Sequence, residues 1–253
     1  VTVEHLLSQM GNSVRKVTTE EIRTYLADYQ KNSNCSNVTI DNIRRNISSF
    51  FSWLEEEDYI LKSPMRRIHK IKTKTVVKNT ISDESIEKLR DYCTEIRDLA
   101  IIDLLYSTGI RVGELVNLNI DDIDLEGREC IVYGKGDKER RVYFDAKAKV
   151  HLKEYIEGRK DENKALFVTL DAPYDRLKIS GVEIRLRQLG RKLDLEKIHP
   201  HKFKRTMATR AIDKGMPIEQ VQKILGHSQI DTTMQYAMVN QNNVKTSHQK
   251  YMS

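Results

Sequence analysis

The chain has 253 residues, enough for two domains with a sizeable core, and 32% of its residues are charged. Its 43 basic and 37 acidic side chains give a net charge of +6, a weak indication of a polyanionic partner. No apolar run is long enough to span a bilayer, and no signal peptide is recognisable. The three cysteines form neither a disulfide framework nor a metal-binding pattern, so reduced thiols in a cytosolic protein are expected.

Residues 1–65 are predicted to form a small helical domain. Thr18 begins a capping box at the start of one helix, and an apolar stripe with helical spacing runs through residues 37–60. Arg44 and Arg45 lie off this stripe, so we expect both to face solvent. Such a pair is either a solvated surface or a contact for DNA phosphates, and the sequence leaves both interpretations open.

A basic segment follows, in which residues 62–78 hold seven Lys or Arg residues and no acidic residue. We predict an extended interdomain linker over residues 66–79. It is either a solubilising tether or a strap along a DNA backbone, where each neutralised phosphate releases a counterion. The one-sided charge favours the strap. The predicted DNA contacts in it are Arg66, Arg67, Lys70, Lys72 and Lys74.

Residues 80–236 are predicted to form a second domain, mainly helical with one small antiparallel β-sheet. A strongly apolar helix in this domain ends at Gly109. The apolar pattern then changes to strict alternation, which predicts strands over residues 129–133 and 140–144. Residues 134–137 join these strands as a tight turn.

The segment from His199 to Tyr236 carries the candidate chemistry. It contains a helix with Phe203 and Met207 on its core face, and it ends in a single tyrosine. A phenol can attack phosphorus without a metal when cations and hydrogen-bond donors stabilise the transition state. The histidines lack a matching fourth ligand for zinc, so no metal site is predicted. The candidate catalytic residues, two of which precede this segment, are Arg111, Lys135, His201, Lys204, His227 and Tyr236.

Each candidate also has an ordinary structural explanation when it is taken alone. Arg111 could form a helix-start ion pair with Glu114, and Lys135 could be a turn lysine. His201 could cap a helix, and Tyr236 could be a half-buried packing residue. The order and local context of the whole set favour a catalytic role over these separate explanations.

Four motifs together resemble the catalytic motifs of the tyrosine recombinase (phage integrase) family: STGIRVGEL, YGKGDKERRV, HPHKFKRTMAT and LGHSQIDTTMQY. The resemblance runs through residues 80–236, and the basic helical domain before it is similar to the family's core-binding domain. It implies a two-domain, C-shaped DNA clamp acting on double-stranded DNA in the bacterial cytoplasm. It also implies a homo-oligomer, from dimer to tetramer, on DNA and a reaction with no metal or ATP as cofactor.

The resemblance implies a role for each candidate residue. Tyr236 would attack a DNA phosphodiester and form a 3′-phosphotyrosyl bond, freeing a 5′-hydroxyl. Arg111 would hold the phosphate, and Lys135 would protonate the leaving 5′-oxygen. His201 would assist proton transfer from the tyrosine, and His227 would donate a hydrogen bond to the phosphate. Two rounds of strand exchange would then pass through a Holliday junction.

Lys204 departs from the family pattern, which has His-x-x-Arg where this chain has HKFK. The neighbouring Arg205 is no obvious substitute, because the next residue is turned by about 100° around the helix. Lysine keeps the charge but lacks the bidentate fork. We expect a cost of roughly 2–4 kcal/mol in the transition state, and hence a slowed enzyme. Glu114 matches the family's acidic residue, which supports the site by orienting it.

Two other functions stay open on the sequence alone: a type IB topoisomerase, and a non-cleaving, site-specific DNA-binding protein, which Lys204 would suit. The natural role expected from the resemblance is that of the integrase of a mobile element. Residues 237–253 are either a frayed end or, as we favour, a tail that docks on a neighbouring protomer. The chain begins with Val1 rather than Met, which is consistent with removal of an accessory N-terminal domain.

Overall fold

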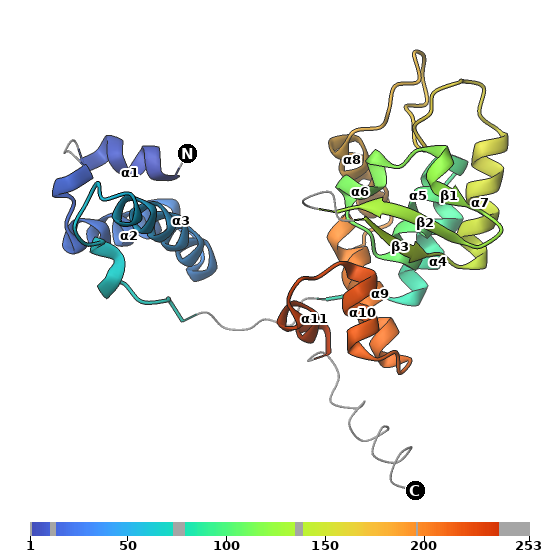
Figure 1. Ribbon diagram of the computed structural model, residues 1–253. Helices are drawn as coiled ribbons and strands as arrows, with labels where there is room; N and C mark the ends of the chain where they lie inside the picture. The colour runs from blue at the N-terminus through green and yellow to red at the C-terminus, as the bar shows by residue number, and fades with distance from the viewer. Residues whose placement is uncertain (1, 11–13, 73–78, 135–138, 196, 238–253) are drawn as a thin grey trace, which may run out of the picture. The chain divides into compact units, whose positions relative to one another are not determined.

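The computed structural model describes residues 2–10, 14–72, 79–134, 139–195 and 197–237. The chain divides into two compact units, residues 1–76 and 77–253, and each has its own hydrophobic core (Figure 1). Helices dominate both units, and the sheet found among the described residues is small and antiparallel, which confirms the predicted fold class. None of the described helices is long and apolar enough to cross a membrane.

The described part of the first unit is built on helices that share one core. They are α1 (Thr2–Met10), α2 (Thr19–Ser33) and α3 (Asn37–Glu56), with two short 3₁₀ segments, η1 (Val14–Lys16) and η2 (Pro64–Arg67). Thr18 caps α2, and the predicted capping box with Glu21 is present. Leu6, Ile22 and Phe51 are fully buried between the helices. Their burial stabilises these helices more than helix propensity does.

The prediction that Arg44 faces solvent is wrong. Its side chain is only 12% exposed, and its Nε donates a hydrogen bond to the buried Asp41 carboxylate at 2.8 Å. This hydrogen bond holds the pKa of Asp41 below its usual value. The side chain of Arg45 is exposed as expected, so α3 has a buried and an exposed arginine next to each other.

The first part of the predicted linker belongs to the folded first unit. Ile68 and Ile71 pack against its core, and the backbone N–H of Ile71 donates to the Asp41 carboxylate at 3.0 Å. Arg66 lies in η2, and its guanidinium pairs with Glu55. An extended linker therefore cannot begin at residue 66, because isoleucines that cover a core hold the chain in place. The later linker residues, 73–78, lie outside the described part of the chain.

Helices surround a small sheet in the described part of the second unit. The helices are α4 (Asp83–Tyr92), α5 (Ile96–Thr108), α6 (Val112–Asn117), α7 (Ala146–Glu157), α8 (Ile179–Lys192), α9 (Pro200–Asp213), α10 (Ile218–Leu225) and α11 (Ile230–Ala237), with the 3₁₀ segment η3 (Ile120–Asp122). The strongly apolar helix α5 is buried along most of its length and packs against α7 and α9. A helix that is apolar on all sides belongs in a core, and α5 is the core helix of this unit.

The sheet is antiparallel in the order β1-β2-β3, with the strands β1 (Ile123–Asp124), β2 (Glu129–Tyr133) and β3 (Glu139–Tyr143). The prediction missed β1, because two residues are too few for a periodic signal, and placed the start of β3 one residue late. Alternation puts Cys130, Val132 and Val142 on the buried face. Arg140 points to that same face, since it is two residues from Val142. Residues 135–137 of the predicted turn lie outside the described residues.

The helices α9, α10 and α11 gather at one end of the second unit (Figure 1, orange to red). Gly109 ends α5 in the left-handed region at φ +62°, and a Cβ there would lie 2.7 Å from Cε of Met207 on α9. The turn that leads into Arg111 therefore lies directly against α9. This contact brings the first of the four sequence motifs beside the last two, which hold Met207 and Leu225.

Candidate active site

The last turn of α10 is the meeting point of three cationic side chains from other elements. The carbonyls of residues 224, 225 and 226 accept hydrogen bonds, in that order, from Arg140 Nε at 2.9 Å, Lys204 Nζ at 2.9 Å and Arg111 Nη2 at 3.3 Å. Carbonyls at the C-terminal end of a helix lack intrahelical partners and carry partial negative charge, so they attract cations. The end of α10 therefore ties together β3, α9 and the start of α6.

The carboxylate of Glu114 is a second meeting point for two of these cations. Both terminal nitrogens of Arg140 donate to it at 2.7 Å, one to each oxygen. Arg111 donates to it through its backbone N–H and through Nη1, both at 2.8 Å. Burial is the largest single effect and opposes ionisation of this carboxyl, but the hydrogen bonds and charges of Arg140 and Arg111 together outweigh it, so the pKa of Glu114 lies below its usual value. Glu114 is therefore charged and fully hydrogen-bonded.

The cluster has more positive than negative charge, because it contains three cationic side chains and one carboxylate. Glu114 and Arg140 neutralise each other in a bidentate pair with side chains that are 4% and 13% exposed. The side chain of Arg111 is 40% exposed, so it is the cation of this cluster that an anion from solvent can reach. An arrangement of this kind fits a phosphate group.

Lys204 is almost completely buried, at 5% exposure, and its ammonium points to the carbonyl of Leu225. Burial is the main reason that its pKa falls to about 7, and the charges of Arg111 and Arg140 lower it further. Buried lysines near other cations commonly behave in this way. Near neutral pH, Lys204 is therefore divided between its charged and neutral forms in the protein without DNA.

His227 follows the left-handed residue Gly226, whose φ of +62° turns the chain out of α10. Its Nδ1 lies 2.9 Å from the hydroxyl of the fully buried Thr233. Burial, followed by the charge of Lys204, lowers the pKa of His227 to about 4, so the ring is neutral at pH 7. When Thr233 donates to Nδ1, the proton sits on Nε2, which can then donate to a ligand.

Tyr236 lies on α11, and its ring stacks on that of His227 with a centroid distance of 6.1 Å. It also packs against the small core around Met207. Burial raises the pKa of Tyr236, and the charges of Arg205 and Arg111 oppose that effect. The phenol is therefore protonated at neutral pH, and a nucleophilic role requires its proton to be removed as the reaction proceeds.

Of the two remaining candidates, His201 and Lys135, the structure describes only His201. His201 lies in the first turn of α9 with an exposed side chain, whereas Lys204 on the same helix turns inward. The two side chains therefore do not point to one target. The ring of His201 lies near that of His199, with centroids 6.4 Å apart. Lys135 lies outside the described residues.

On the first unit, the predicted DNA contacts lie mostly at the surface. Arg44 and Arg45 both line a hollow of ≈ 480 Å³ along one face of α3, although only 12% of the Arg44 side chain is exposed. Hydroxyl side chains and the half-exposed Trp53 line the same hollow. The remaining predicted contacts that the structure describes have exposed side chains, namely Arg66, Arg67, Lys70 and Lys72. Lys74 lies outside the described residues.

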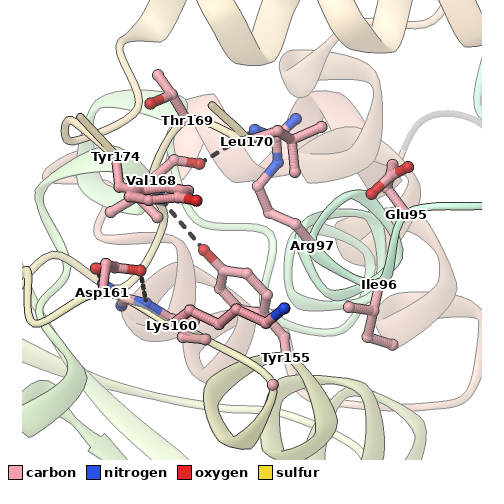
Figure 2. A pocket seen from close by; sticks show the side chains of 12 residues that line it. Glu95, Ile96, Arg97, Tyr155, Lys160, Asp161, Val168, Thr169, Leu170 and Tyr174 are labelled. Carbon is pink, nitrogen blue, oxygen red and sulfur yellow. Dashed lines mark hydrogen bonds and ion pairs between the residues drawn. The ribbon is translucent and has the colours of Figure 1, made fainter. Parts of the chain in front are cut away.

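A pocket of ≈ 290 Å³ in the second unit is lined by none of the predicted catalytic residues (Figure 2). Its arginines are engaged in the fold: Arg97 donates to the carbonyl of Val168, and Arg159 pairs with Asp161. The hydroxyl of Tyr155 accepts from the backbone N–H of Val168. These bonds hold loops in place, so the pocket is not the candidate site. Among the described residues, no three His, Cys, Asp or Glu side chains are grouped as a metal site would require.

Two residues of the site were missed by sequence reasoning. Arg140 has a signal in the sequence, because the alternation of β3 puts it on the same face as the buried Val142. Lys204 was predicted as a site residue, but its burial one turn before the core residue Ala208 on α9 was not. Thr233 has no comparable signal, since its contact with His227 depends on how α11 folds back.

The comparisons with known proteins agree with this arrangement. The family model described as "Phage integrase family" matches residues 66–243, and the "Phage integrase, N-terminal SAM-like domain" matches residues 1–61. A "Tyrosine recombinase XerC" of Oceanobacillus iheyensis is 30% identical, covering 99% of this chain and 86% of the relative. The XerC of Leptospira interrogans is 32% identical, covering 91% of this chain and 77% of the relative.

Among solved structures, the XerH site-specific recombinase bound to its palindromic difH substrate after cleavage has the same fold. The two chains superpose with a TM-score of 0.79 at 20% identity, over 100% of this chain and 77% of the XerH chain. The fold and the site define a DNA strand-exchange protein of the integrase type. The chain belongs to the phage integrase family of tyrosine recombinases.

Proposed function

We propose that this protein is a site-specific recombinase that cuts and rejoins double-stranded DNA through a 3′-phosphotyrosine intermediate. The observation that carries the proposal is the end of α10, where three cations meet beside His227 and Tyr236. This site has a surplus of positive charge, hydrogen-bond donors and a phenol. That combination suits attack on a phosphodiester.

In the proposed reaction, the oxygen of Tyr236 forms a bond to phosphorus and the bond from phosphorus to the 5′-oxygen breaks. Arg111 and Lys204 stabilise the charge that builds up on the non-bridging oxygens, and Nε2 of His227 donates a hydrogen bond to one of them. The phenol proton passes to a nearby base, for which His201 is the candidate, and Lys135 protonates the leaving 5′-oxygen. The ester keeps the bond energy, so the reaction requires neither ATP nor a metal ion.

The first unit supplies the second DNA contact in this proposal. Arg45 and the hydroxyl side chains along α3 form a polar face with a half-exposed Trp53 at its edge. Arg66, Lys70 and Lys72 add exposed positive charge in the same unit. Phosphate contacts of this kind give affinity and register, and their number sets the salt dependence of binding.

Further parts of the proposal concern assembly and biological role. Strand exchange between two duplexes needs more than one active site, so we propose a homo-oligomer on DNA, from dimer to tetramer. Its substrate is genomic or mobile DNA, which places it in the bacterial cytoplasm. The association with a mobile element and the docking of residues 237–253 on a neighbouring protomer stay predictions. Lys204 is the observation that favours the alternative, a non-cleaving DNA-binding protein.

A trapping experiment tests the reaction. The target would first be selected from a library of duplexes by binding, and then rebuilt with a nick so that the cleaved end cannot be rejoined. The protein should form a covalent adduct on a denaturing gel, and Tyr236→Phe should bind the same DNA without forming it. An adduct with Tyr236→Phe would show that another residue is the nucleophile. Intact binding without any adduct would support the non-cleaving alternative.

Adding a second duplex distinguishes the two enzymatic readings. A recombinase joins the cut strand to the partner duplex, whereas a topoisomerase religates the original strand. Recombinant products of new length are expected here. Relaxation of supercoiled DNA without such products would instead support the topoisomerase reading.

A further inference from the structure

Arg140 and Arg111 both donate to the two meeting points of the site, but the side chain of Arg140 is only 13% exposed, against 40% for Arg111. Its two terminal nitrogens hold Glu114, and its Nε donates to the carbonyl of Ile224 in the last turn of α10. The partners are 26 and 84 residues away in the sequence. A single planar group therefore joins β3 to α6 and to α10.

The glycine at the end of α10 fits this guanidinium. A Cβ at Gly226 would lie 3.1 Å from Cζ, Nε and Nη1 of Arg140. The residue that turns the chain toward His227 is thus in contact with Arg140 itself. The position of His227 depends on this contact as well as on the helix.

Arg140 also affects how strongly Arg111, the exposed cation of the site, can bind an anion. Glu114 is shared between Arg111 and Arg140, and the bidentate bond to Arg140 neutralises it. Without Arg140, the buried carboxylate would have Arg111 as its main cationic partner. Arg111 would then be held to Glu114 and would bind a phosphate less well.

We propose that Arg140 is a positioning residue for DNA cleavage, which acts through Glu114 on Arg111 and through the last turn of α10 on His227. It does not touch the phosphate. The inference rests on the proposed function, since it concerns the reaction at Tyr236.

The neighbouring arginine provides a matched control. Arg141 lies next to Arg140 on β3, but its side chain is 60% exposed and pairs with Glu129 on the open face of the sheet. Arg140→Gln and Arg141→Gln remove the same charge, so comparing them cancels the general effect of charge, and saturating DNA removes any remaining difference in affinity. Only Arg140→Gln should slow adduct formation at saturating DNA, by about 10²-fold, the effect of a displacement of about 1 Å. Arg140→Lys should recover part of this loss, because it restores the charge without the fork.

A second substitution separates positioning from folding. Because Arg140 acts through Glu114, the double variant Arg140→Gln/Glu114→Gln should cleave no more slowly than Arg140→Gln alone. Independent losses would instead multiply. Thermal unfolding of each variant shows whether it is folded, and if Arg140→Gln is not, the same comparison is made with Arg140→Lys and Arg141→Lys.

The outcomes are distinct. Equal cleavage rates for the Arg140 and Arg141 variants would overturn the inference, and losses that multiply in the double variant would overturn its route through Glu114. Either result leaves the proposed function intact. Absence of an adduct with the unaltered protein would overturn the proposed function and this inference together. A loss of rate confined to Arg140, with coupling to Glu114, supports both.

Discussion

Replacing Lys204 with arginine should raise the rate of DNA cleavage, and the gain should grow with pH. The ammonium of Lys204 is buried, has its hydrogen bond to the carbonyl of Leu225, and lies beside Arg111 and Arg140. Its pKa of about 7 means that the protein without DNA loses this charge as the pH rises above neutrality. An arginine stays charged throughout this range and can donate in a bidentate manner.

The size of the effect follows from that pKa. Above pH 7, each pH unit lowers the charged fraction of Lys204 about tenfold, which corresponds to about 1.4 kcal/mol. The ratio of the Lys204→Arg rate to the unaltered rate should therefore be constant below pH 7 and rise about tenfold per unit above it. The constant part measures the geometric advantage of the fork, roughly 10²–10³ in rate.

The assay is adduct formation on the nicked duplex between pH 6 and pH 9, with DNA below saturation. Under this condition the second-order rate constant reports protonation of the protein before it binds DNA. Ionisation of Tyr236 affects both proteins alike and cancels in the ratio. Lys214→Arg, at an exposed lysine at the end of α9, is the control and should leave the rate unchanged. Equal rates for Lys204→Arg and the unaltered protein would refute the reasoning, and a ratio that is flat with pH would refute its electrostatic part.

Two further predictions concern the same end of the second unit. Gly226→Ala should lower the free energy of unfolding by about 1–2 kcal/mol, because the backbone there is left-handed, and should also slow cleavage, because the new Cβ would meet Arg140. Gly215→Ala is the control, since Gly215 has φ +90° but open space around it. It should lower stability without slowing cleavage in the same gel assay. Lys204→Met should remove a pH dependence of the free energy of unfolding. Between pH 7 and 10 the unfolded chain binds the lysine proton more tightly than the folded protein does. The free energy of unfolding of the unaltered protein therefore rises with pH, by about 1.4 kcal/mol per unit. Urea unfolding at pH 7 and pH 9 measures this, and equal slopes for both proteins would contradict the burial of a titrating lysine.

Local patterns in the sequence were enough to predict much of the fold. The capping box at Thr18, the left-handed end of α5 at Gly109 and the strands β2 and β3 each depend on contacts within a few residues or on a simple alternation. The linker was predicted less well. The isoleucines that fix residues 66–72 to the first core carry no periodic signal in a segment dominated by lysine and arginine.

The candidate site shows the same division. The order of Arg111, His227 and Tyr236 in their motifs could be recognised without a structure, and so could the substitution at Lys204. What the sequence did not predict is how these motifs come together within the folded chain. Arg111 reaches Gly226 across 115 residues, and no local pattern encodes a contact over that separation.

The sequence by itself therefore determined the fold class and the family motifs, and it made Tyr236 the candidate nucleophile, because these depend on residue type and short-range spacing. Only the tertiary structure decided that Arg140 neutralises Glu114, that Lys204 is buried against a helix end, and that Arg44 is withdrawn from solvent. The physical reason is the same in each case. Burial changes the charge and hydrogen bonding of a side chain, and burial is set by elements that meet only in the folded protein.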